Sequence, residues 1–535
     1  MILSPSQEIA KNKISDFLKS YDISKNMFIL EGSAGTGKST VITYILNLPE
    51  YQNKNVVYSA TTNKAVSVLK KYSNQPEKYS FCTIHKLLNI KRKIDNSGNE
   101  LFDVIVDDET NESIKTKSIY QYDIIVIDES SMISCSLLTK LTKILEKIPG
   151  KIIFLGDPAQ LPPVNETNSL IFYIKDIPRF RLKEIMRYKG KIVDLCNSVR
   201  DIVFEPSHKI KFSEFKCDTI KLYKNIDKSI EKYLKFMEKG FRPIFLVYTN
   251  RKCDLINSRI RDSIFSDTKK KYEIGEIILF NNYHMSNSGK SYYTSQQMIV
   301  SGVKEESIDF SSIDINNIFK ISFKKKEKID GDCVMCNNRV ERESLCGCRL
   351  CNTCIKDWIN NKLVCPYCFV KVYGNRVEIK GDSKLEEMIN NLVSQFEGMG
   401  FKTYHLELKE KKEEKKDIIV TIHEDSESEY KIFIDDIRER LKDIKHYIDK
   451  NYKKNKLFNA LMLNLWQNFY QNYIDIIADI CYGYAITTHK SQGSNYKVVF
   501  VDMENIITCN TNQIESYRCL YTAITRTSKY LNILM

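Results

Sequence analysis

Short runs of apolar residues recur through the first half of the chain, each bounded by Gly, Asp or Ser. They cover Met27–Leu30, Asn55–Tyr58, Ile124–Ile127 and Ile152–Leu155. Runs of this length without polar alternation are typical of parallel strands that are buried on both faces. Helical patterns follow them, for instance at Lys38–Asn47 and Leu137–Lys147. Alternating strands and helices predict a doubly wound α/β domain that binds ligands at the carboxyl ends of its strands.

A second α/β unit is predicted from Asp176 onward. One face of a helix would carry Ile226, Ile230, Tyr233, Leu234 and Met237, with Gly240 at the helix end. The apolar run Ile244–Tyr248 then predicts a buried strand.

The pattern changes again around Gly275. Glu276–Phe280 and Gln297–Val300 are separated by Gly and Asn turns, and similar residues resume at Ile418–Ile422, which indicates a small β-barrel. A helical stretch from Asp435 to Ile477 leads to a final strand at Val498–Val501. The resulting fold class is α/β, with these predicted domains: 1–175; 176–270 with 478–535; a barrel at 271–330 and 370–430; a cysteine-rich module at 331–369; and a helical connection at 431–477.

The chain has 535 residues, too many for one hydrophobic core, and we expect three or four domains. Its formal charge of +13 favours a polyanionic partner, because Lys and Arg release counterions from phosphates. The sequence contains neither a secretory signal pattern nor an apolar run of about 18 residues, so we expect a soluble intracellular protein of cytoplasm or nucleus, with no membrane contact. The abundance of Lys, Asn and Ile favours an AT-rich genome, such as that of a large DNA virus.

A glycine-rich loop follows the first strand and precedes a helix. It reads Gly32-Ser33-Ala34-Gly35-Thr36-Gly37-Lys38-Ser39, followed by Thr40, and fits G-x-x-x-x-G-K-[ST]. Backbone N–H groups of such a loop surround phosphates, and the helix N-terminus adds positive potential. We therefore expect ATP to bind here, with Lys38 at the β- and γ-phosphates and Ser39 on Mg²⁺.

Two further strand ends carry candidate chemistry. Ile124–Ile127 runs directly into Asp128 and Glu129, which places Asp128 beside Mg²⁺ and Glu129 where it could polarise the attacking water. The next strand is followed by Gly156-Asp157-Pro158-Ala159-Gln160. The Gln160 amide could hydrogen-bond the γ-phosphate and a group on the nucleic-acid side.

Three segments resemble motifs I, II and III of superfamily 1 helicases, close to RecD and the phage Dda helicase of the 5′-to-3′ branch. They are Gly32–Ser39, Ile127–Met132 and Gly156–Val164. Further segments resemble family motifs in the same order. They are Gln7 in Leu3–Gln7, Thr61–Ala65, Thr83–Lys86, Leu182–Arg187, Thr487–Ser494 and Leu520–Arg526. The resemblance covers both ends of the chain and implies two RecA-like motor domains that move along a single strand of DNA. It also implies an inserted hairpin at 89–117, which serves as a wedge in relatives.

The resemblance also implies roles for individual residues. Gln7 would read the adenine edge, while Arg187 and Arg526 would project across an interdomain cleft and neutralise charge on the γ-phosphate. The strand-contacting positions would be Thr62, Asn63, Thr83, His85, Thr488, His489 and Lys490. Hydroxyl, amide and ammonium groups suit phosphate contacts that fix position without reading sequence. His85 and His489 could instead be core histidines.

Half of the 16 cysteines lie between Cys333 and Cys368. In a reducing compartment such clusters indicate metal binding and not disulfides. The eight thiols, enough for two tetrahedral Zn²⁺ sites, belong to Cys333, Cys336, Cys346, Cys348, Cys351, Cys354, Cys365 and Cys368.

The order of these cysteines resembles a RING domain. Cross-bracing as in that family would pair Cys333, Cys336, Cys351 and Cys354 on one zinc and the other four on the second. Cys348 stands where RING domains commonly carry His, and Phe369 stands where active ubiquitin ligases often place a basic residue. The module could therefore dock a protein or DNA instead of transferring ubiquitin.

Three functions remain open from the sequence. The first is an ATP-dependent helicase that acts on single-stranded or forked DNA. The second is a RING-type ubiquitin ligase, or a zinc-dependent interaction protein, on a dead motor scaffold. Intact Lys38, Asp128, Glu129, Gln160, Arg187 and Arg526 argue against it. The third is a translocase that does not separate strands. The oligomeric state stays open, and the sequence is compatible with a monomer.

Overall fold

The computed structural model describes residues 3–20, 26–73, 75–95, 97–104, 119–145, 148, 150–187, 190–265, 270–309, 320–322, 342–343, 349–350, 376–378, 383–395, 399–409, 417–451, 462–463, 465–467, 469–510 and 512–535. The cysteines of the predicted zinc module all lie outside these ranges. The two zinc sites therefore stay a prediction. Within the described ranges, no group of three or more His, Cys, Asp or Glu side chains is arranged to hold a metal ion.

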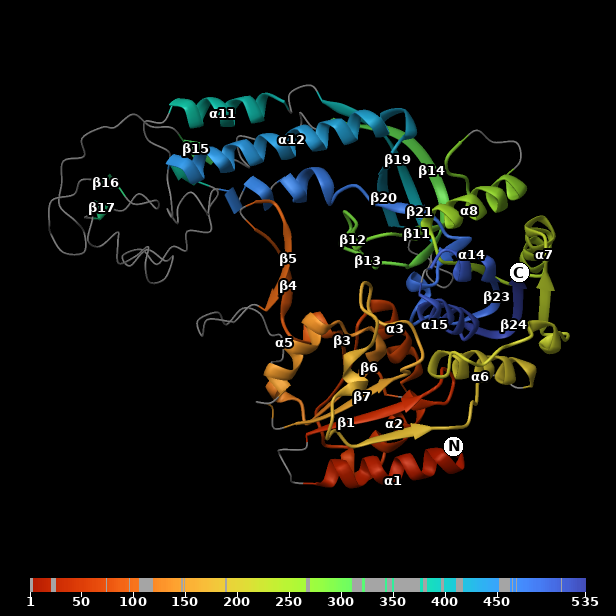
Figure 1. The fold of residues 1–535 in the computed structure, drawn as a ribbon. Coiled ribbons are helices and arrows are strands. Elements are labelled where there is room, and N and C mark those ends of the chain that lie inside the picture. Colours follow the sequence, from red (N-terminus) through yellow and green to blue (C-terminus); the bar gives the residue numbers. More distant parts are fainter. Residues whose placement is uncertain are drawn as a thin grey trace.

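The first lobe is a parallel six-stranded sheet covered by helices on both faces. Its strand order is β3-β2-β6-β7-β1-β8, and every neighbouring pair is parallel. The strands are β1 (Met27–Gly32), β2 (Val56–Ala60), β3 (Ser80–Thr83), β6 (Ile124–Asp128), β7 (Lys151–Gly156) and β8 (Arg179–Leu182). The helices are α1 (Pro5–Lys19), α2 (Lys38–Leu46), α3 (Asn63–Tyr72), α4 (Ile84–Leu87) and α5 (Cys135–Leu145). Figure 1 shows this lobe at the N-terminal, red-to-yellow end of the chain.

Successive side chains of these strands enter two different cores. Phe28 and Leu30 of β1 pack with α1, α2 and α3, whereas Ile29 between them packs with α4 and α5. Side chains of a strand alternate between its two faces, so a strand buried on both sides needs apolar residues throughout. The prediction of a doubly wound parallel sheet is confirmed.

The first lobe extends further along the chain than the sequence indicated. We placed the start of the second unit at residue 176, but β8 pairs in parallel with β1 at the edge of the first sheet. The pattern of β8, Arg-Phe-Arg-Leu, buries only Leu182 fully and lacks the long apolar run of a central strand. An edge strand with polar residues gives little periodic signal, which explains the misplaced boundary.

The second lobe is a parallel five-stranded sheet with the order β22-β10-β23-β24-β9. Its strands are β9 (Ile220–Tyr223), β10 (Pro243–Val247), β22 (Ala485–Thr487), β23 (Tyr496–Asp502) and β24 (Thr527–Leu534). Its helices are α6 (Lys191–Phe204), α7 (Ile226–Glu238), α8 (Asn250–Ile264), α14 (Met503–Thr508) and α15 (Gln513–Ile524). The predicted helix ending at Gly240 is confirmed by α7. Gly240 has φ +74°, and its N–H donates to the Met237 carbonyl at 2.8 Å.

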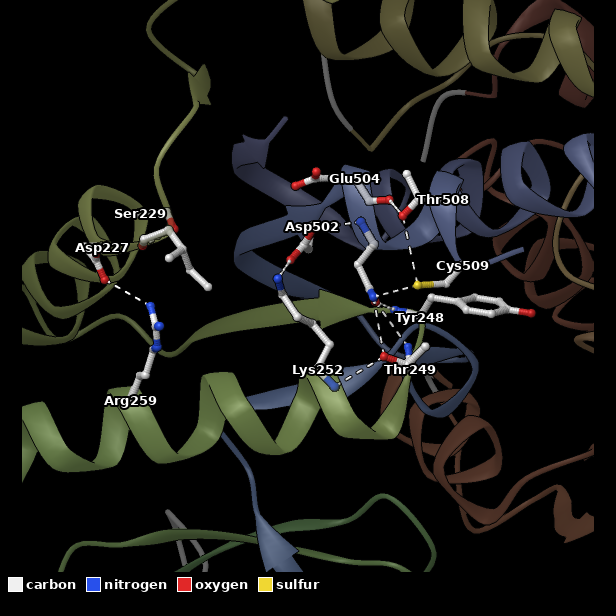
Figure 2. A network of polar contacts seen from close by, with 12 residues as sticks. Asp227, Ser229, Tyr248, Thr249, Lys252, Arg259, Asp502, Glu504, Thr508 and Cys509 are labelled. Atoms are coloured by element: carbon white, nitrogen blue, oxygen red, sulfur yellow. Dashed lines mark hydrogen bonds and ion pairs between the residues drawn. The ribbon is translucent and has the colours of Figure 1, made fainter. Parts of the chain in front are cut away.

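A polar network fixes the corner of this lobe where β10 meets α8 and α14 (Figure 2). Asn505 Oδ1 accepts the Tyr248 and Thr249 N–H groups at 2.8 and 3.2 Å. Lys252 Nζ lies 3.3 Å from Asp502 Oδ2, a fully buried carboxylate. These contacts orient the carboxyl end of β10, which lies beside β22 and the loop that follows β22.

An antiparallel sheet is inserted between α8 and β22. Its order is β20-β19-β14-β11-β21, formed by β11 (Ile277–Phe280), β14 (Gln297–Asp309), β19 (Gly400–Lys409), β20 (Asp417–Ile422) and β21 (Ile480–Tyr482). The predicted strands are present, and β14 continues nine residues beyond the predicted end at Val300. The predicted closure into a barrel is not among the pairings of the described residues, because β20 and β21 lie at opposite ends of the order.

Helices and short strand pairs belong to the same insertion. The long helix α12 (Glu424–Asn451) begins before the predicted start at Asp435, and α11 (Ser383–Ser394) packs against it. The remaining paired strands are β12 (His284–Met285) with β13 (Ser291–Tyr292), β15 (Lys320–Ser322) with β18 (Arg376–Glu378), and β16 (Arg342–Glu343) with β17 (Arg349–Leu350). None of the helices that the structure describes is long and apolar enough to cross a membrane.

A two-stranded hairpin bridges from the first lobe to the insertion. Strands β4 (Ile90–Ile94) and β5 (Glu100–Val104) pair antiparallel within the predicted hairpin region. The hairpin stands upright between the first lobe and the helices of the insertion in Figure 1. At its turn, the Gly98 carbonyl accepts the Tyr470 hydroxyl at 3.3 Å. A side chain at Gly98 would come within 2.5 Å of the Trp466 ring.

Candidate active site

The loop between β1 and α2 is shaped by its glycines. Gly35 and Gly37 have φ values of +86° and +80°, a region that L-residues with a side chain rarely adopt. A Cβ on Gly32 would lie 2.6 Å from Thr36 Oγ1, the hydroxyl that donates to the Ser33 carbonyl at 2.9 Å. The loop therefore closes into a compact turn whose N–H groups precede the N-terminus of α2, as a phosphate-binding loop requires.

Lys38 and Ser39 begin α2 and point into this loop. Lys38 Nζ donates to the Gly32 carbonyl at 2.7 Å and to the Ser33 carbonyl at 3.3 Å. Burial lowers the pKa of Lys38, and the carboxylates of Asp157, Asp128 and Glu129 oppose that shift. A cationic amine held by carbonyls among three carboxylates is suited to bind phosphate oxygens.

The acidic pair lies at the carboxyl end of β6. Asp128 Oδ2 accepts the Ser39 hydroxyl at 2.8 Å, and Asp128 Oδ1 accepts the Glu129 N–H at 2.7 Å. Glu129 has φ 52°, a left-handed conformation that is uncommon for residues with a side chain. Burial raises the pKa of Glu129, and Arg526 is the strongest opposing charge. A carboxylate with a raised pKa can accept a proton from water more readily than an exposed one.

The second lobe supplies Arg526, which follows α15. Its side chain is almost fully buried, and Nη2 donates to Gln160 Oε1 at 3.0 Å. Arg526 Nε also donates to the Thr522 carbonyl at 3.1 Å. This guanidinium therefore reaches across to the turn that follows β7 of the first lobe.

Arg187 reaches the same site from the segment between the lobes. Its backbone N–H and that of Met186 donate to the Gly35 carbonyl at 3.2 and 2.8 Å. Its side chain donates to Asn495 Oδ1 of the second lobe at 2.6 Å. We expected Arg187 to be presented by the second domain. Instead, the first lobe's loop holds its backbone, because Arg187 follows β8 of the first sheet.

One cavity of about 740 Å³ collects these groups. Its lining contains residues of the first lobe, of the connecting segment and of the second lobe. Among them are Ala34, Gly35, Gly37, Lys38, Ser39, Thr40, Asp128, Glu129, Asp157, Gln160, Arg187, Asn495 and Arg526. The candidate phosphate, metal, water and arginine positions thus face one another in a single pocket.

Gln7 lies against the same loop from outside that lining. It belongs to a capping box at the start of α1, where Gln7 Oε1 accepts the Ser4 N–H at 2.9 Å. Its Nε2 donates to the Thr36 carbonyl at 2.9 Å. Both ends of the amide are therefore engaged by the protein, next to the loop that would hold the phosphates.

The candidate strand-contacting residues follow the carboxyl ends of parallel strands. Thr62 and Thr83 are helix N-caps, whose hydroxyls accept the Ala65 and Lys86 N–H groups at 3.2 Å each. Asn63, His85, His489 and Lys490 are partly buried. Burial lowers the pKa of both histidines, which favours neutral rings.

Thr488 and Lys490 differ from that expectation in detail. Thr488 is fully buried, and its hydroxyl donates to the Val247 carbonyl at 3.1 Å. Its side chain therefore fixes the loop after β22 and is not exposed for contact with DNA. Lys490 Nζ donates to Asn281 Oδ1 of the inserted sheet at 2.8 Å. Lys64 likewise joins the first lobe to the Ser295 carbonyl at 3.2 Å. The motif loops and the insertion therefore contact one another directly.

Comparisons with known proteins divide the chain in the same way. Residues 11–201 match the family described as AAA domain, and residues 482–534 match the UvrD-like helicase C-terminal domain. The ATP-dependent DNA helicase Dda of Enterobacteria phage T4 is 28% identical over 284 residues, which is 50% of this chain and 59% of Dda. The chain is thus similar to superfamily 1 helicases of the RecD and Dda branch in both lobes.

Other relatives match this chain over different shares of its length. An uncharacterized protein of Acanthamoeba polyphaga mimivirus is 27% identical over 566 residues, covering 100% of both chains. The RecD subunit of the RecBCD enzyme of Buchnera aphidicola subsp. Schizaphis graminum is 31% identical over 28% of this chain and 25% of that protein. The structure of Pif1 helicase from Candida albicans is 15% identical with a TM-score of 0.43, covering 100% of this chain and 94% of that one.

The site contains residues that sequence reasoning missed. Asn495 directly follows the Thr487–Ser494 segment and binds Arg187. Asp157 stands inside the quoted Gly156–Gln160 segment, yet we gave it no role. Arg200 of α6 contacts Asp157 and lies in none of the quoted segments. Adjacency to a motif could have indicated the first two residues, whereas Arg200 carries no local signal.

Proposed function

We propose that the chain is an ATP-dependent DNA helicase that moves 5′ to 3′ along single-stranded DNA and couples ATP hydrolysis to strand separation. One observation carries the proposal: a single cavity holds Lys38 and Glu129 of the first lobe together with Arg526 of the second. Hydrolysis at such a site depends on how the lobes are oriented, and this dependence couples chemistry to motion. The relative Dda is named an ATP-dependent DNA helicase, which supports DNA as the track.

The proposed chemistry assigns one task to each group. Lys38 binds the β- and γ-phosphates, while Glu129 accepts hydrogen bonds from the attacking water and orients it. Gln160, Arg187 and Arg526 neutralise charge that develops on the transferred phosphoryl group. A guanidinium in this position contributes about 10³–10⁵ to the rate in enzymes that use one.

A magnesium ion fits between the loop and the acidic strand end. Ser39 Oγ and Asp128 Oδ2 lie 2.8 Å apart, and hydroxyl and carboxylate oxygens are the ligands that Mg²⁺ prefers. Magnesium bound there would neutralise phosphate charge. Ser39 and Asp128 would exchange their mutual hydrogen bond for contacts to the ion.

We propose that the single-stranded DNA runs across the carboxyl ends of both β-sheets. Asn63, His85, His489 and Lys490 follow those ends and remain partly exposed. Contacts of this kind go to the DNA backbone and carry no sequence information. Opening and closing of the cleft would move the two sets of contacts along the strand in turn.

The β4–β5 hairpin is our proposed wedge at the fork. Separating a base-pair step costs about 1.4 kcal/mol in stacking, so the strands must be held apart as the motor advances. The hairpin turn is supported from the insertion by Tyr470 and Trp466. A supported hairpin can resist the duplex, whereas an isolated two-stranded hairpin is only marginally stable.

An unwinding assay on forked duplexes tests this function. One fork carries a 5′ single-stranded tail, the other carries a 3′ tail, and a blunt duplex serves as control. We expect ATP-dependent opening of the 5′-tailed fork alone. Opening of the 3′-tailed fork alone would contradict the proposed direction. Strand-stimulated ATP hydrolysis without opening of either fork would instead identify a translocase.

We also propose that residues 333–368 bind two zinc ions and provide a docking surface for a protein or DNA. The support is the spacing of the cysteine pairs, because thiolates at such spacings favour tetrahedral zinc. Metal analysis should find two zinc ions per chain, and Cys333→Ser should remove one. Chelation should release both ions and leave ATP turnover intact. A zinc-free protein would refute this assignment, and loss of turnover would show that the module supports the motor.

A further inference from the structure

The turn after β7, residues 157–161, belongs to the first lobe by connectivity but is held by the second. Arg518 of α15 donates to the Pro158 carbonyl and, at 3.3 Å, to the Gln160 carbonyl. The Leu161 N–H donates to Thr522 Oγ1 at 3.0 Å. Gln492 Nε2 donates to the Leu161 carbonyl at 3.1 Å. Both α15 and the loop after β22 therefore form hydrogen bonds to the turn that follows β7.

Asp157 is the charged anchor of this turn. Its side chain is fully buried, and Oδ2 accepts the Tyr521 hydroxyl at 2.7 Å. The Arg200 side chain is 3% exposed, and its Nη2 lies 3.4 Å from Asp157 Oδ1. A buried carboxylate is costly unless it is paired and hydrogen-bonded. The first lobe thus places a charge inside the second lobe, between α6 and α15.

The same carboxylate shapes the turn that carries Gln160. Asp157 Oδ1 accepts the Ala159 N–H at 3.1 Å, and the Gln160 N–H donates to the Asp157 carbonyl at 3.1 Å. Gln160 Oε1 in turn meets Arg526, which lies one helical turn beyond Thr522. Asp157, which also lines the cavity, and Tyr521 behind it therefore support the pair that faces the γ-phosphate position.

We propose that Asp157, Arg200 and Tyr521 are positioning residues that lock the phosphate-sensing turn to the second lobe. These contacts of Asp157 with Arg200 and Tyr521 form a joint between the lobes. When the second lobe moves on DNA, the joint moves Gln160 and Arg526 together relative to the γ-phosphate position. The inference rests on the proposed function, because it needs a motor whose hydrolysis responds to DNA. It assigns a role to Arg200, which lies outside every motif segment, and to the hydroxyl of Tyr521, to which the motif resemblance assigned none.

Two substitutions test the joint with minimal change of shape. Tyr521→Phe removes only a hydroxyl, and Asp157→Asn removes the charge but keeps an acceptor for the Ala159 N–H. Loss of a buried charge-assisted hydrogen bond corresponds to about a tenfold change. We expect kcat with saturating single-stranded DNA to fall about tenfold, while KM for ATP changes less than about threefold. The double variant should lose no more than the worse single variant, since both break one joint.

DNA stimulation separates a positioning role from a structural one. In both variants the ratio of kcat with DNA to kcat without DNA should fall. Arg200→Met should lower the same ratio, and Arg200→Lys should restore part of it. Tyr233→Phe is the matched control, because Tyr233 is fully buried in the second lobe and donates to the Pro243 carbonyl at 2.9 Å, away from the joint. It removes a buried tyrosine hydroxyl in the same way, but one that donates to backbone carbonyls, and it should leave DNA stimulation unchanged.

The outcomes distinguish this inference from the proposed function. Wild-type DNA stimulation in folded Tyr521→Phe and Asp157→Asn proteins would overturn the joint while leaving the motor intact. An equal loss in Tyr233→Phe would also overturn it, because the effect would then be general destabilisation. A wild-type protein whose ATP hydrolysis does not respond to DNA would instead contradict the proposed function itself.

Discussion

Lys38 is placed to bind a phosphate, and this placement lowers the stability of the nucleotide-free protein. Lys38 is partly buried, contacts carbonyls, and has a pKa lowered by burial. A lysine whose pKa is lower in the folded than in the unfolded protein lowers the free energy of unfolding at pH values where the unfolded lysine is protonated. At any pH below this lowered pKa, the Lys38 ammonium therefore destabilises the nucleotide-free fold.

We expect Lys38→Met to abolish ATP hydrolysis without lowering the thermal stability of the nucleotide-free protein. Methionine fills similar volume and carries no charge to desolvate, so Tm should stay unchanged or rise. Thermal unfolding and steady-state ATPase measurements check the two parts. Substantial ATP turnover in the variant would refute the phosphate-binding role, and a lower Tm would refute the stability argument.

Sequence reasoning located the candidate residues that directly follow predicted strands. The glycine loop, Asp128, Glu129 and Gln160 each follow a strand that the apolar pattern predicted, and they meet in one cavity. It assigned Arg187 to the wrong lobe, because β8 lacks the apolar signal of a central strand. Thr488 of the Thr487–Ser494 segment was predicted to contact DNA, yet its side chain is buried, because a motif match carries no information about side-chain direction.

At the scale of elements, the parallel strands were predictable and their connections were less so. Strands buried on both faces, such as β6 and β7, need unbroken apolar runs that can be read directly. The start of α12 at Glu424 was missed because its first turns carry mostly exposed polar residues. The sheet of the insertion joins strands about 200 residues apart, such as β11 and β21, and no local pattern specifies that pairing.

The contact between the hairpin and the insertion leads to an element-scale prediction. We expect Gly98→Ala to reduce unwinding of 5′-tailed forks several-fold while DNA-stimulated ATP hydrolysis remains. A methyl group there meets the Trp466 ring, and the φ of +81° also disfavours alanine. Parallel assays of unwinding and hydrolysis measure the split. Gly289→Ala, where φ is +82° and the added Cβ meets nothing within 4 Å, is the matched control. Equal losses in both activities would contradict the wedge.

At the scale of the whole molecule, the net charge and the two-lobed architecture fit a motor that binds single-stranded DNA. The formal charge is +13, and the candidate contacts lie at the carboxyl ends of both sheets. Backbone binding releases counterions, at about 0.7 per phosphate contact for single strands. Affinity for single-stranded DNA should therefore fall steeply with salt and vary little with base sequence.

Titrations of labelled oligonucleotides at several salt concentrations check this expectation. A plot of log affinity against log salt should be linear with a negative slope for both mixed and homopolymeric strands. Affinity that is insensitive to salt, or that differs by orders of magnitude between sequences, would contradict backbone recognition by the two lobes.

The central claim is that one nucleotide is held between the lobes and is hydrolysed with the help of the second. The most direct measurement is ATP turnover by Arg526→Ala at saturating single-stranded DNA, with nucleotide affinity measured alongside. We predict a loss of about 10³ in kcat with affinity changed only a few-fold, because the guanidinium acts on developing charge. Turnover close to that of the unmodified protein would contradict the account.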